Sequence, residues 1–208
     1  MKDKDLTRQR IIIAVGEIFR TEGQKGLYIA RIAREAGVDR SLIYQYFGKE
    51  IKTLIEAYIV QKDYWLNFFE KINEEVSKSN YETGKDLIID VLQKQLQFFS
   101  ADTEMQHLIL WELSGDSELM RSIHNTRELM GESILEMADE KFKDSLVKFR
   151  PIAVLLLGGI YYANVHSIYN GSIICGMDVK SKQGQIDLMK AIQQIIEWAY
   201  EHAEKNKQ

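Results

Sequence analysis

Hydrophobic residues recur at intervals of three and four along most of the chain, which is the spacing of one face of an α-helix. The first such segment covers about residues 5–21 and carries charged residues on its opposite side. Two shorter segments follow, at about 28–36 and 40–47, and Gly37 separates them. A glycine there can adopt the positive φ that a tight turn between two helices requires. The pattern therefore predicts three N-terminal helices around one turn.

The rest of the chain continues with the same periodicity in longer segments. One long helix is predicted at about 49–78, and the later helices are predicted at about 82–99, 103–113, 117–142, 151–169 and 184–204. Pro151 suits the first position of its helix, where the missing N–H is not needed. Residues 172–183 lack the pattern and are predicted to form a loop. The sequence thus predicts an all-α fold of about nine helices.

Composition agrees with a mostly helical, soluble protein. Hydrophobic residues make up 45% and charged residues 28% of the 208 residues, with one proline. The single cysteine, Cys175, excludes an internal disulfide and a cysteine-rich zinc site. The charged N-terminus does not resemble a signal peptide, and the longest apolar run, about 152–163, is shorter than the roughly 20 residues of a membrane span. We therefore expect a cytoplasmic protein without membrane contact, in which this run forms a buried helix.

Charge is distributed unevenly along the chain. Residues 1–52 contain 11 Lys and Arg against 7 Asp and Glu, a net +4, which leaves −8 on residues 53–208 for the total of −4. A basic N-terminal segment on an acidic body is expected when a DNA-binding module is joined to a domain that does not touch DNA. An excess of this size also arises by ordinary scatter, so charge alone supports DNA binding only weakly.

The segment from Arg31 to Phe47 has the residues that a helix-turn-helix motif requires. Ala33 is small where two helices touch, Gly37 makes the turn, and Asp39 can cap the following helix. In such motifs the second helix enters the major groove, where side chains contact base edges and phosphates. The alternative is a three-helix corner without a DNA role. The predicted DNA-binding residues are Arg31, Arg40, Ser41, Leu42, Tyr44, Gln45, Tyr46 and Lys49.

This N-terminal segment resembles the DNA-binding domain of the TetR family of bacterial transcriptional regulators. The likeness covers about residues 7–54 and rests on three blocks in the family's order and spacing, "TRQRIIIAVGEIF", "GLYIARIAREAGV" and "IYQYF". The resemblance implies a homodimeric repressor that a small-molecule effector releases from a near-palindromic operator. It further implies a helix-turn-helix DNA-binding domain at 1–48 and a helical effector-binding and dimerisation domain at 49–208.

Three positions depart from the family's usual pattern. The family usually has threonine or serine where Ile29 stands, near the start of the second helix. Leu42 replaces a polar residue and can instead contact a thymine methyl group. Members usually carry a lysine at the position of Glu50, which Lys49 precedes here. Either Lys49 takes over the contact with the DNA backbone through a shifted helix start, or one phosphate contact is missing.

The body of the chain offers candidates for a ligand pocket and for a dimer interface. Aromatic stripes at helical spacing usually form the core, but they can also line an apolar pocket between helices. The pocket candidates are Trp65, Phe68, Phe69, Phe99, His107, Trp111, Tyr162 and His166. Family members pair through their last two long helices, which are apolar here on more than one side. The dimer candidates are Leu155, Leu156, Gly159, Ile192, Ile195, Ile196 and Ala199.

The sequence contains no enzymatic motif that we recognise. It holds no P-loop, no G-x-S-x-G, no dinucleotide fingerprint and no metal-ligand spacing such as H-E-x-x-H. We therefore predict no catalytic residue, no cofactor and no metal. The predicted partners are double-stranded operator DNA, a small-molecule effector of unknown identity and a second copy of the chain. The alternative is a helical interaction protein of the same fold with weak or no specific DNA binding.

Overall fold

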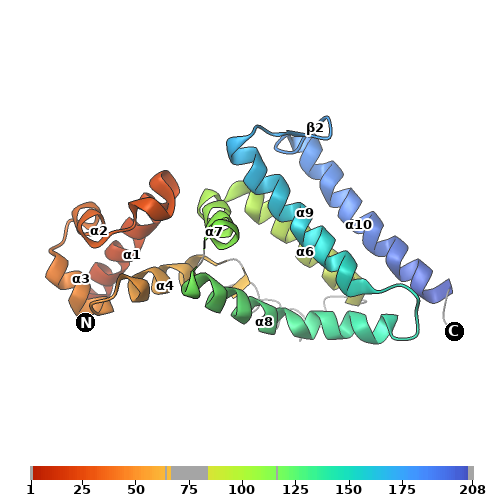
Figure 1. Cartoon of the computed structure of the whole chain (residues 1–208), viewed down its shortest axis with the longest axis horizontal. Helices are drawn as coiled ribbons and strands as arrows, with labels where there is room; N and C mark the ends of the chain where they lie inside the picture. Colours follow the sequence, from red (N-terminus) through yellow and green to blue (C-terminus); the bar gives the residue numbers. More distant parts are fainter. Residues whose placement is uncertain (1, 64, 67–83, 116, 206–208) are drawn as a thin grey trace. The chain divides into compact units, whose positions relative to one another are not determined.

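The computed structural model describes residues 2–63, 65–66, 84–115 and 117–205 (Figure 1). These residues contain nine α-helices, one 3₁₀ helix and one short hairpin, which confirms the predicted all-α fold class. The chain forms two compact units. The first comprises Met1–Asn67 with Thr103–His124, and the second comprises Phe68–Asp102 with Asn125–Gln208.

The first unit contains the three N-terminal helices and two later ones. Its elements are α1 (Lys2–Glu22), the 3₁₀ helix (Gly23–Gly26), α2 (Ile29–Ala36), α3 (Arg40–Phe47), α4 (Ile51–Lys62) and α7 (Thr103–Ser114). The periodic apolar positions predicted from the sequence form its core. Fully buried core side chains include Ile11, Val15, Ile18, Phe19, Ile32, Ile43, Leu54 and Ile59.

Phe19 is the point where α7 joins the N-terminal helices. Its buried ring lies edge-on to the rings of Tyr58 and His107, with centroids 5.9 Å away in both cases, and 6.1 Å from Trp111. The ring nitrogen Nδ1 of His107 also lies 2.9 Å from the carbonyl oxygen of Phe19. The compact unit that holds the helix-turn-helix segment therefore also holds α4 and α7. The functional boundary expected after residue 48 stays a prediction.

The long helix predicted at 49–78 is wrong, because α4 ends at Lys62. Asp63 takes extended backbone angles, φ −61° and ψ 121°, and is fully buried. Its carboxylate oxygen Oδ1 accepts hydrogen bonds from the backbone N–H groups of Trp65 (3.0 Å) and Leu66 (3.2 Å). An aspartate that caps following N–H groups ends one helix and starts another. The remainder of the predicted segment lies outside the described residues.

The second unit is built on three long helices that lie side by side (Figure 1). Helix α6 (Gly84–Ala101) packs against α9 (Phe149–Tyr169) and α10 (Lys182–Lys205). Helix α8 (Glu118–Phe142) precedes α9, and its residues up to His124 belong to the first unit. The hydroxyl of Ser100 on α6 lies 3.0 Å from Oδ1 of Asn164 on α9 and 2.9 Å from Oε1 of Gln185 on α10. One polar junction thus connects all three helices.

The loop predicted at 172–183 contains a hairpin instead. Strand β1 (Ile173–Ile174) pairs antiparallel with β2 (Met177–Asp178). Cys175 and Gly176 join them with φ values of 51° and 77°, and two consecutive positive φ angles are typical of the tightest hairpin turns. Helix α10 then begins at Lys182, before the predicted loop ends.

Helix α9 is longer and more exposed than the sequence suggested. It begins at Phe149, so Pro151 lies within its first turn rather than at its first position. By length and composition alone it is apolar enough to cross a membrane, and 28% of its apolar window is buried. Val154, Leu155 and Tyr162 are 67%, 77% and 59% exposed. The expectation of a buried helix is therefore wrong for one side of α9.

Candidate DNA-binding surface

The turn between α2 and α3 has the geometry of a helix-turn-helix motif. Gly37 follows α2 in the left-handed region, with φ 62° and ψ 40°, a conformation that is strained for a residue with a Cβ atom. Its N–H donates to the carbonyl oxygens of Ala33 and Arg34, and the N–H of Val38 donates to Ala33 over 3.0 Å. These bonds satisfy carbonyls that the helix end would otherwise leave without partners. The predicted role of Gly37 is thus confirmed.

Asp39 caps the second helix of the motif, as predicted. Its carboxylate oxygen Oδ1 accepts a hydrogen bond of 2.8 Å from the backbone N–H of Ser41. Hydrogen bonds from the hydroxyl and then from the N–H of Ser41 hold the pKa of the Asp39 carboxyl below its usual range. The start of α3 is therefore fixed by a charged cap.

Two arginines of α1 contact the helix-turn-helix motif, one at its turn and one at the end of α3. The guanidinium Nη2 of Arg10 donates hydrogen bonds to the carbonyl oxygens of Ala36 (2.7 Å) and Gly37 (3.2 Å). The guanidinium carbon of Arg8 lies 5.2 Å from the ring centroid of Phe47, a cation–π contact. Sequence analysis did not identify either role. These two basic side chains therefore contribute to the position of the turn and of α3.

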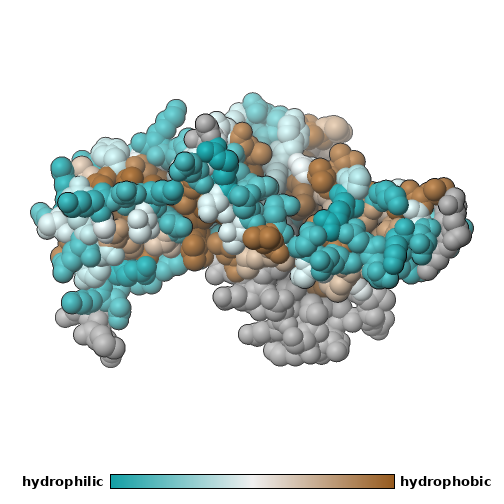
Figure 2. All heavy atoms as spheres, turned by 60° about the horizontal axis from the view of Figure 1, so that its bottom comes forward, coloured by the Kyte–Doolittle hydropathy of each residue, from teal (hydrophilic) through white to brown (hydrophobic). Residues whose placement is uncertain are grey.

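The outer side of α3 gathers four of the predicted DNA-binding residues. Arg40, Ser41, Tyr44 and Gln45 are all exposed, while Ile43 and Phe47 on the opposite side are buried. Leu42 and Tyr46 are half-buried at the flanks of this face, and Lys49 is exposed beyond the helix end. Figure 2 shows hydrophilic side chains over much of the visible surface of this unit, with apolar ones between them. The structure thus presents a polar helix face, and its contact with DNA stays a prediction.

Arg31 is held by two carboxylates in this structure. Its Nη2 lies 3.0 Å from Oε1 of Glu22, and its Nη1 forms an ion pair with Glu35. Hydrogen bonds to Glu35 and Glu22 raise the pKa of the guanidinium above its already high usual value. An arginine in this position would have to exchange a carboxylate for a phosphate in order to contact DNA. Its predicted DNA role is not tested by this arrangement.

Tyr28 is a candidate that sequence analysis missed. Helix α2 begins at Ile29, so Tyr28 is its N-cap residue, and its side chain makes no capping hydrogen bond. The side chain is 52% exposed at the N-terminus of the helix that crosses the DNA backbone in such motifs. A tyrosine directly before the expected threonine or serine position was the available signal in the sequence. A phenolic hydroxyl there is suited to a phosphate oxygen.

The start of α4 includes position 50, where the family usually carries a lysine and this chain has Glu50. The helix begins at Ile51 and Glu50 is its N-cap residue, without a side-chain capping hydrogen bond. Lys49 directly precedes the cap and is exposed. A glutamate at the cap is compatible with the positive end of the helix dipole but cannot bind a phosphate. Both alternatives, a contact through Lys49 or a missing contact, remain predictions.

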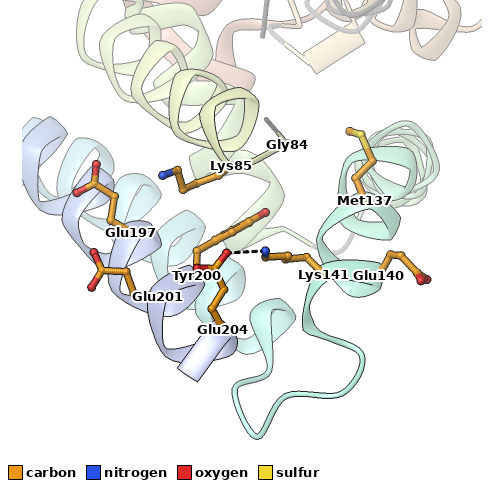
Figure 3. Close-up of a pocket in the computed structure, with 9 residues that line it drawn as sticks. All are labelled: Gly84, Lys85, Met137, Glu140, Lys141, Glu197, Tyr200, Glu201 and Glu204. Atoms are coloured by element: carbon orange, nitrogen blue, oxygen red, sulfur yellow. Dashed lines mark hydrogen bonds and ion pairs between the residues drawn. The ribbon is translucent and has the colours of Figure 1, made fainter. Parts of the chain in front are cut away.

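An open hollow of about 830 Å³ lies within the second unit, between the start of α6 and the later parts of α8 and α10 (Figure 3). Lys141 and Glu204, which both line it, form an ion pair of 2.7 Å. Burial, and secondarily the charge of Asp86, raise the pKa of Tyr200 to about 12. The described residues that line the hollow are Gly84, Lys85, Met137, Glu140, Lys141, Glu197, Tyr200, Glu201 and Glu204. This lining has four glutamates and two lysines, and it includes none of the predicted pocket residues.

The predicted pocket residues that the structure describes divide between the two compact units. His107 and Trp111 pack against Phe19 in the first unit. Phe99 is fully buried in the second unit, where its ring centroid lies 5.3 Å from that of Tyr161. Aromatic contacts of this kind are ordinary core packing. A role in effector binding stays a prediction for all three.

The other described pocket candidates also divide between the two units, with Trp65 in the first and Tyr162 and His166 in the second. Tyr162 and His166 stack along α9 with ring centroids 5.1 Å apart, and Tyr162 is largely exposed. The Nδ1 atom of His166 is buried without a hydrogen-bond partner in the described part of the chain. Trp65 is half-buried just after α4. Phe68 and Phe69 lie outside the described residues. Within the described ranges, no group of three His, Cys, Asp or Glu side chains could hold a metal ion.

The predicted dimer residues divide into two sets. Leu155 and Gly159 on α9 and Ile195 on α10 are exposed, with Leu155 at 77% and Ile195 at 36%, and Leu156 is half-buried. The other three belong to the core of the single chain and are Ile192, Ile196 and Ala199. Three further apolar side chains extend the exposed set, namely Tyr162, which is also a pocket candidate, Tyr169 and Trp198; they are 59%, 61% and 55% exposed. We name the exposed side chains Leu155, Tyr162, Tyr169, Ile195 and Trp198 the apolar stripe.

No family model matches the chain, and no curated protein matches it in sequence. Solved structures do match its fold. FadR from Bacillus subtilis in complex with stearoyl-CoA, a transcriptional regulator, aligns over 90% of this chain and 96% of its own, with 19% identity and a TM-score of 0.67. The fatty acid degradation regulator FadR from Bacillus halodurans aligns over 91% and 94%, with 16% identity and a TM-score of 0.63.

A third solved structure has another regulatory role. NalD from Pseudomonas aeruginosa, the secondary repressor of the MexAB-OprM multidrug efflux pump, aligns over 95% of this chain and 96% of its own. Its identity is 17% and its TM-score 0.64. At such identities the likeness shows a shared fold over nearly the whole length of each protein.

Proposed function

We propose that this chain, which has the TetR-like all-α fold, is a cytoplasmic, DNA-binding transcriptional regulator. The observation that carries the proposal is the exposed polar side of α3, with Arg40, Tyr44 and Gln45, on a turn fixed by Gly37 and Asp39. The exposed side chains of α3 include hydrogen-bond donors of the kinds that contact base edges and phosphates. The proposed regulator is a repressor, and its neighbours in fold are described as regulators.

Helix α3 is the proposed recognition helix. The major groove of DNA, about 12 Å wide, admits one α-helix. Arg40 at the start of α3 can donate two hydrogen bonds to a guanine edge or contact a phosphate, and the hydroxyl of Tyr44 suits a phosphate oxygen. Leu42 at the flank can contact a thymine methyl group. Base contacts would give the sequence preference, and the phosphate contacts would set the register.

A second copy of the chain is the proposed partner at the apolar stripe. Exposed apolar side chains that gather on adjacent helices commonly mark a protein interface. Residues 155, 162 and 169 recur at seven-residue intervals along α9, so they share one side of that helix. A twofold dimer would present two copies of α3 to successive major grooves about 34–36 Å apart on a near-palindromic operator.

The second unit is the proposed effector-binding region. The B. subtilis FadR structure contains stearoyl-CoA, which shows that this fold can hold a small molecule with a long apolar chain. An effector that binds only the form with low DNA affinity would release the operator by shifting the population of the two forms. The alternative function is a helical interaction protein of the same fold that lacks specific DNA binding.

Selection from randomised DNA with the purified full-length protein tests the proposal. We expect enrichment of an inverted repeat, with an affinity that falls steeply as salt rises. Arg40→Ala should weaken binding to that repeat by about 1–3 kcal/mol if Arg40 contacts a base. Arg20→Ala on α1 is the matched control and should leave the affinity unchanged. If selection enriched no sequence, the regulator proposal would fail and the interaction protein would be favoured.

A further inference from the structure

Gln95 on α6 is a fully buried amide without a hydrogen-bond partner. Its exposed fraction is 0%, and neither Nε2 nor Oε1 has a partner within the part of the chain that the structure describes. The great majority of buried polar side-chain atoms in proteins are hydrogen-bonded, because an unpaired buried group loses its interaction with water without compensation. An unpaired amide at this depth therefore calls for a specific explanation.

The neighbouring glutamines show that α6 can satisfy an amide where its role is structural. Nε2 of Gln93 donates a hydrogen bond of 2.9 Å to the carbonyl oxygen of Met189, and Nε2 of Gln97 lies 2.9 Å from the sulfur of Met189. Two residues along an α-helix correspond to a rotation of about 200°. Gln95 therefore points away from the side of α6 that faces Met189 on α10.

The side of α6 that carries Gln95 is otherwise apolar. Ile88, Val91, Leu92 and Phe99 lie seven, four and three residues before Gln95 and four residues after it, which places them around it on the same helix face. All four side chains are buried. One neutral amide in an apolar wall resembles a ligand site, in which few polar groups fix the orientation of a mainly apolar molecule.

We propose that Gln95 anchors the effector, and that the effector is an uncharged, mainly apolar molecule with one group that both donates and accepts hydrogen bonds. An amide side chain offers a donor and an acceptor together, so a carboxamide or a hydroxyl complements it. A charged group would lose its hydration opposite a neutral partner, which is unfavourable in an apolar wall. The inference rests on the proposed function of the second unit as the effector-binding region.

The first test measures the thermal stability of the protein without added ligand. If Gln95 is reserved for a ligand, Gln95→Leu removes an unpaired buried amide and should raise Tm, by roughly 2–4 °C. Gln93→Leu is the matched control, because it makes the same chemical change on the same helix but deletes a formed hydrogen bond, and it should lower Tm. A fall in Tm for Gln95→Leu would overturn the proposal.

The second test uses defined neutral probes in isothermal titration with the full-length protein. Octanamide both donates and accepts, whereas N,N-dimethyloctanamide only accepts. We expect octanamide to bind the wild type about tenfold more tightly than its dimethyl analogue, and Gln95→Leu to abolish that difference. Gln93→Leu should retain it. Equal binding of octanamide to the wild type and to Gln95→Leu, or no binding at all, would overturn the assigned ligand class.

These readouts separate the inference from the function on which it rests. The first test measures thermal stability and the second measures ligand binding, and neither requires DNA. If the DNA selection fails while octanamide binds through Gln95, the regulator proposal falls and the ligand site stands. If the selection succeeds while octanamide binding does not depend on Gln95, the ligand site falls and the regulator stands.

Discussion

The guanidinium of Arg10 on α1 donates a hydrogen bond of 2.7 Å to the carbonyl oxygen of Ala36, the last residue of α2. The same Nη2 atom reaches the carbonyl oxygen of Gly37 at 3.2 Å. Carbonyls at a helix C-terminus carry partial negative charge and lack partners within the helix, so a cation stabilises them. The turn of the helix-turn-helix motif is thus tied to α1 by one side chain that is distant in sequence.

Arg10→Met should therefore loosen the motif. We expect a loss of about 1 kcal/mol in the free energy of unfolding, because one charge-assisted hydrogen bond is removed at a partly exposed site. Operator affinity should fall as well, since the position of α3 depends on the turn. Urea unfolding followed by circular dichroism measures the first effect. Arg20→Met on the same helix is the control, and an equal loss in both variants would contradict the assigned role of Arg10.

The cap at Asp39 predicts a pH dependence. The pKa of this carboxyl is lowered in the folded protein, so its contribution to stability is present above the unfolded pKa of about 3.9 and is lost as the pH falls through the lower, folded value. Asp39→Ala should lower Tm at pH 7, and the difference from the wild type should shrink below about pH 4. Thermal unfolding at a series of pH values checks this. A difference that is independent of pH would show that the carboxylate charge is not involved.

Tyr28 is predicted to bind a phosphate through its hydroxyl. Tyr28→Phe removes only that oxygen and should weaken binding by about 1 kcal/mol, roughly fivefold. The loss should be similar for the selected operator and for unrelated DNA, because phosphates carry no sequence information. Fluorescence anisotropy with both DNAs measures the two affinities. A loss confined to the selected operator would assign Tyr28 to base contact instead.

The contact between α4 and α7 should contribute measurably to stability. The hydroxyl of Tyr58 donates a hydrogen bond of 2.8 Å to Oε2 of Glu104, whose side chain is only 15% exposed and which also lies 3.3 Å from Nζ of Lys62. Tyr58→Phe leaves this carboxylate with one partner fewer and should cost about 1–2 kcal/mol of unfolding free energy. Tyr44→Phe, at an exposed position, should cost nothing measurable in urea unfolding. If Tyr58→Phe and Tyr44→Phe had the same free energy of unfolding, the hydrogen bond between Tyr58 and Glu104 would not contribute to stability as predicted.

The apolar stripe is predicted to form the homodimer interface. Leu155→Glu places a charge at a position that is 77% exposed in the single chain, and we expect the dimer to dissociate at least about tenfold more readily. Sedimentation velocity over a range of concentrations measures this. Leu146→Glu is the matched control, because Leu146 is 71% exposed but lies outside α9 and α10. The interface assignment would be wrong if the wild type were monomeric or if both variants dimerised normally.

Local patterns predicted much of the candidate site. The apolar spacing located α2 and α3, and Gly37 and Asp39 were assigned their roles because turn and cap chemistry depend on residues only a few positions apart. Gln95 was also open to prediction, since it interrupts the apolar face that Val91, Leu92 and Phe99 define. Whether its amide has a hydrogen-bond partner could not be predicted, because such a partner would come from another part of the chain.

By itself, the sequence determined the all-α class, the order of most helices and the helix-turn-helix segment, because periodicity, glycine turns and caps act over short stretches of chain. Only the tertiary structure decided that α7 packs on Phe19 and that Ile192 and Ile196 are core rather than surface. Each of these depends on contacts between residues far apart in sequence. A helix that is apolar on several sides has several possible partners, and only packing selects among them.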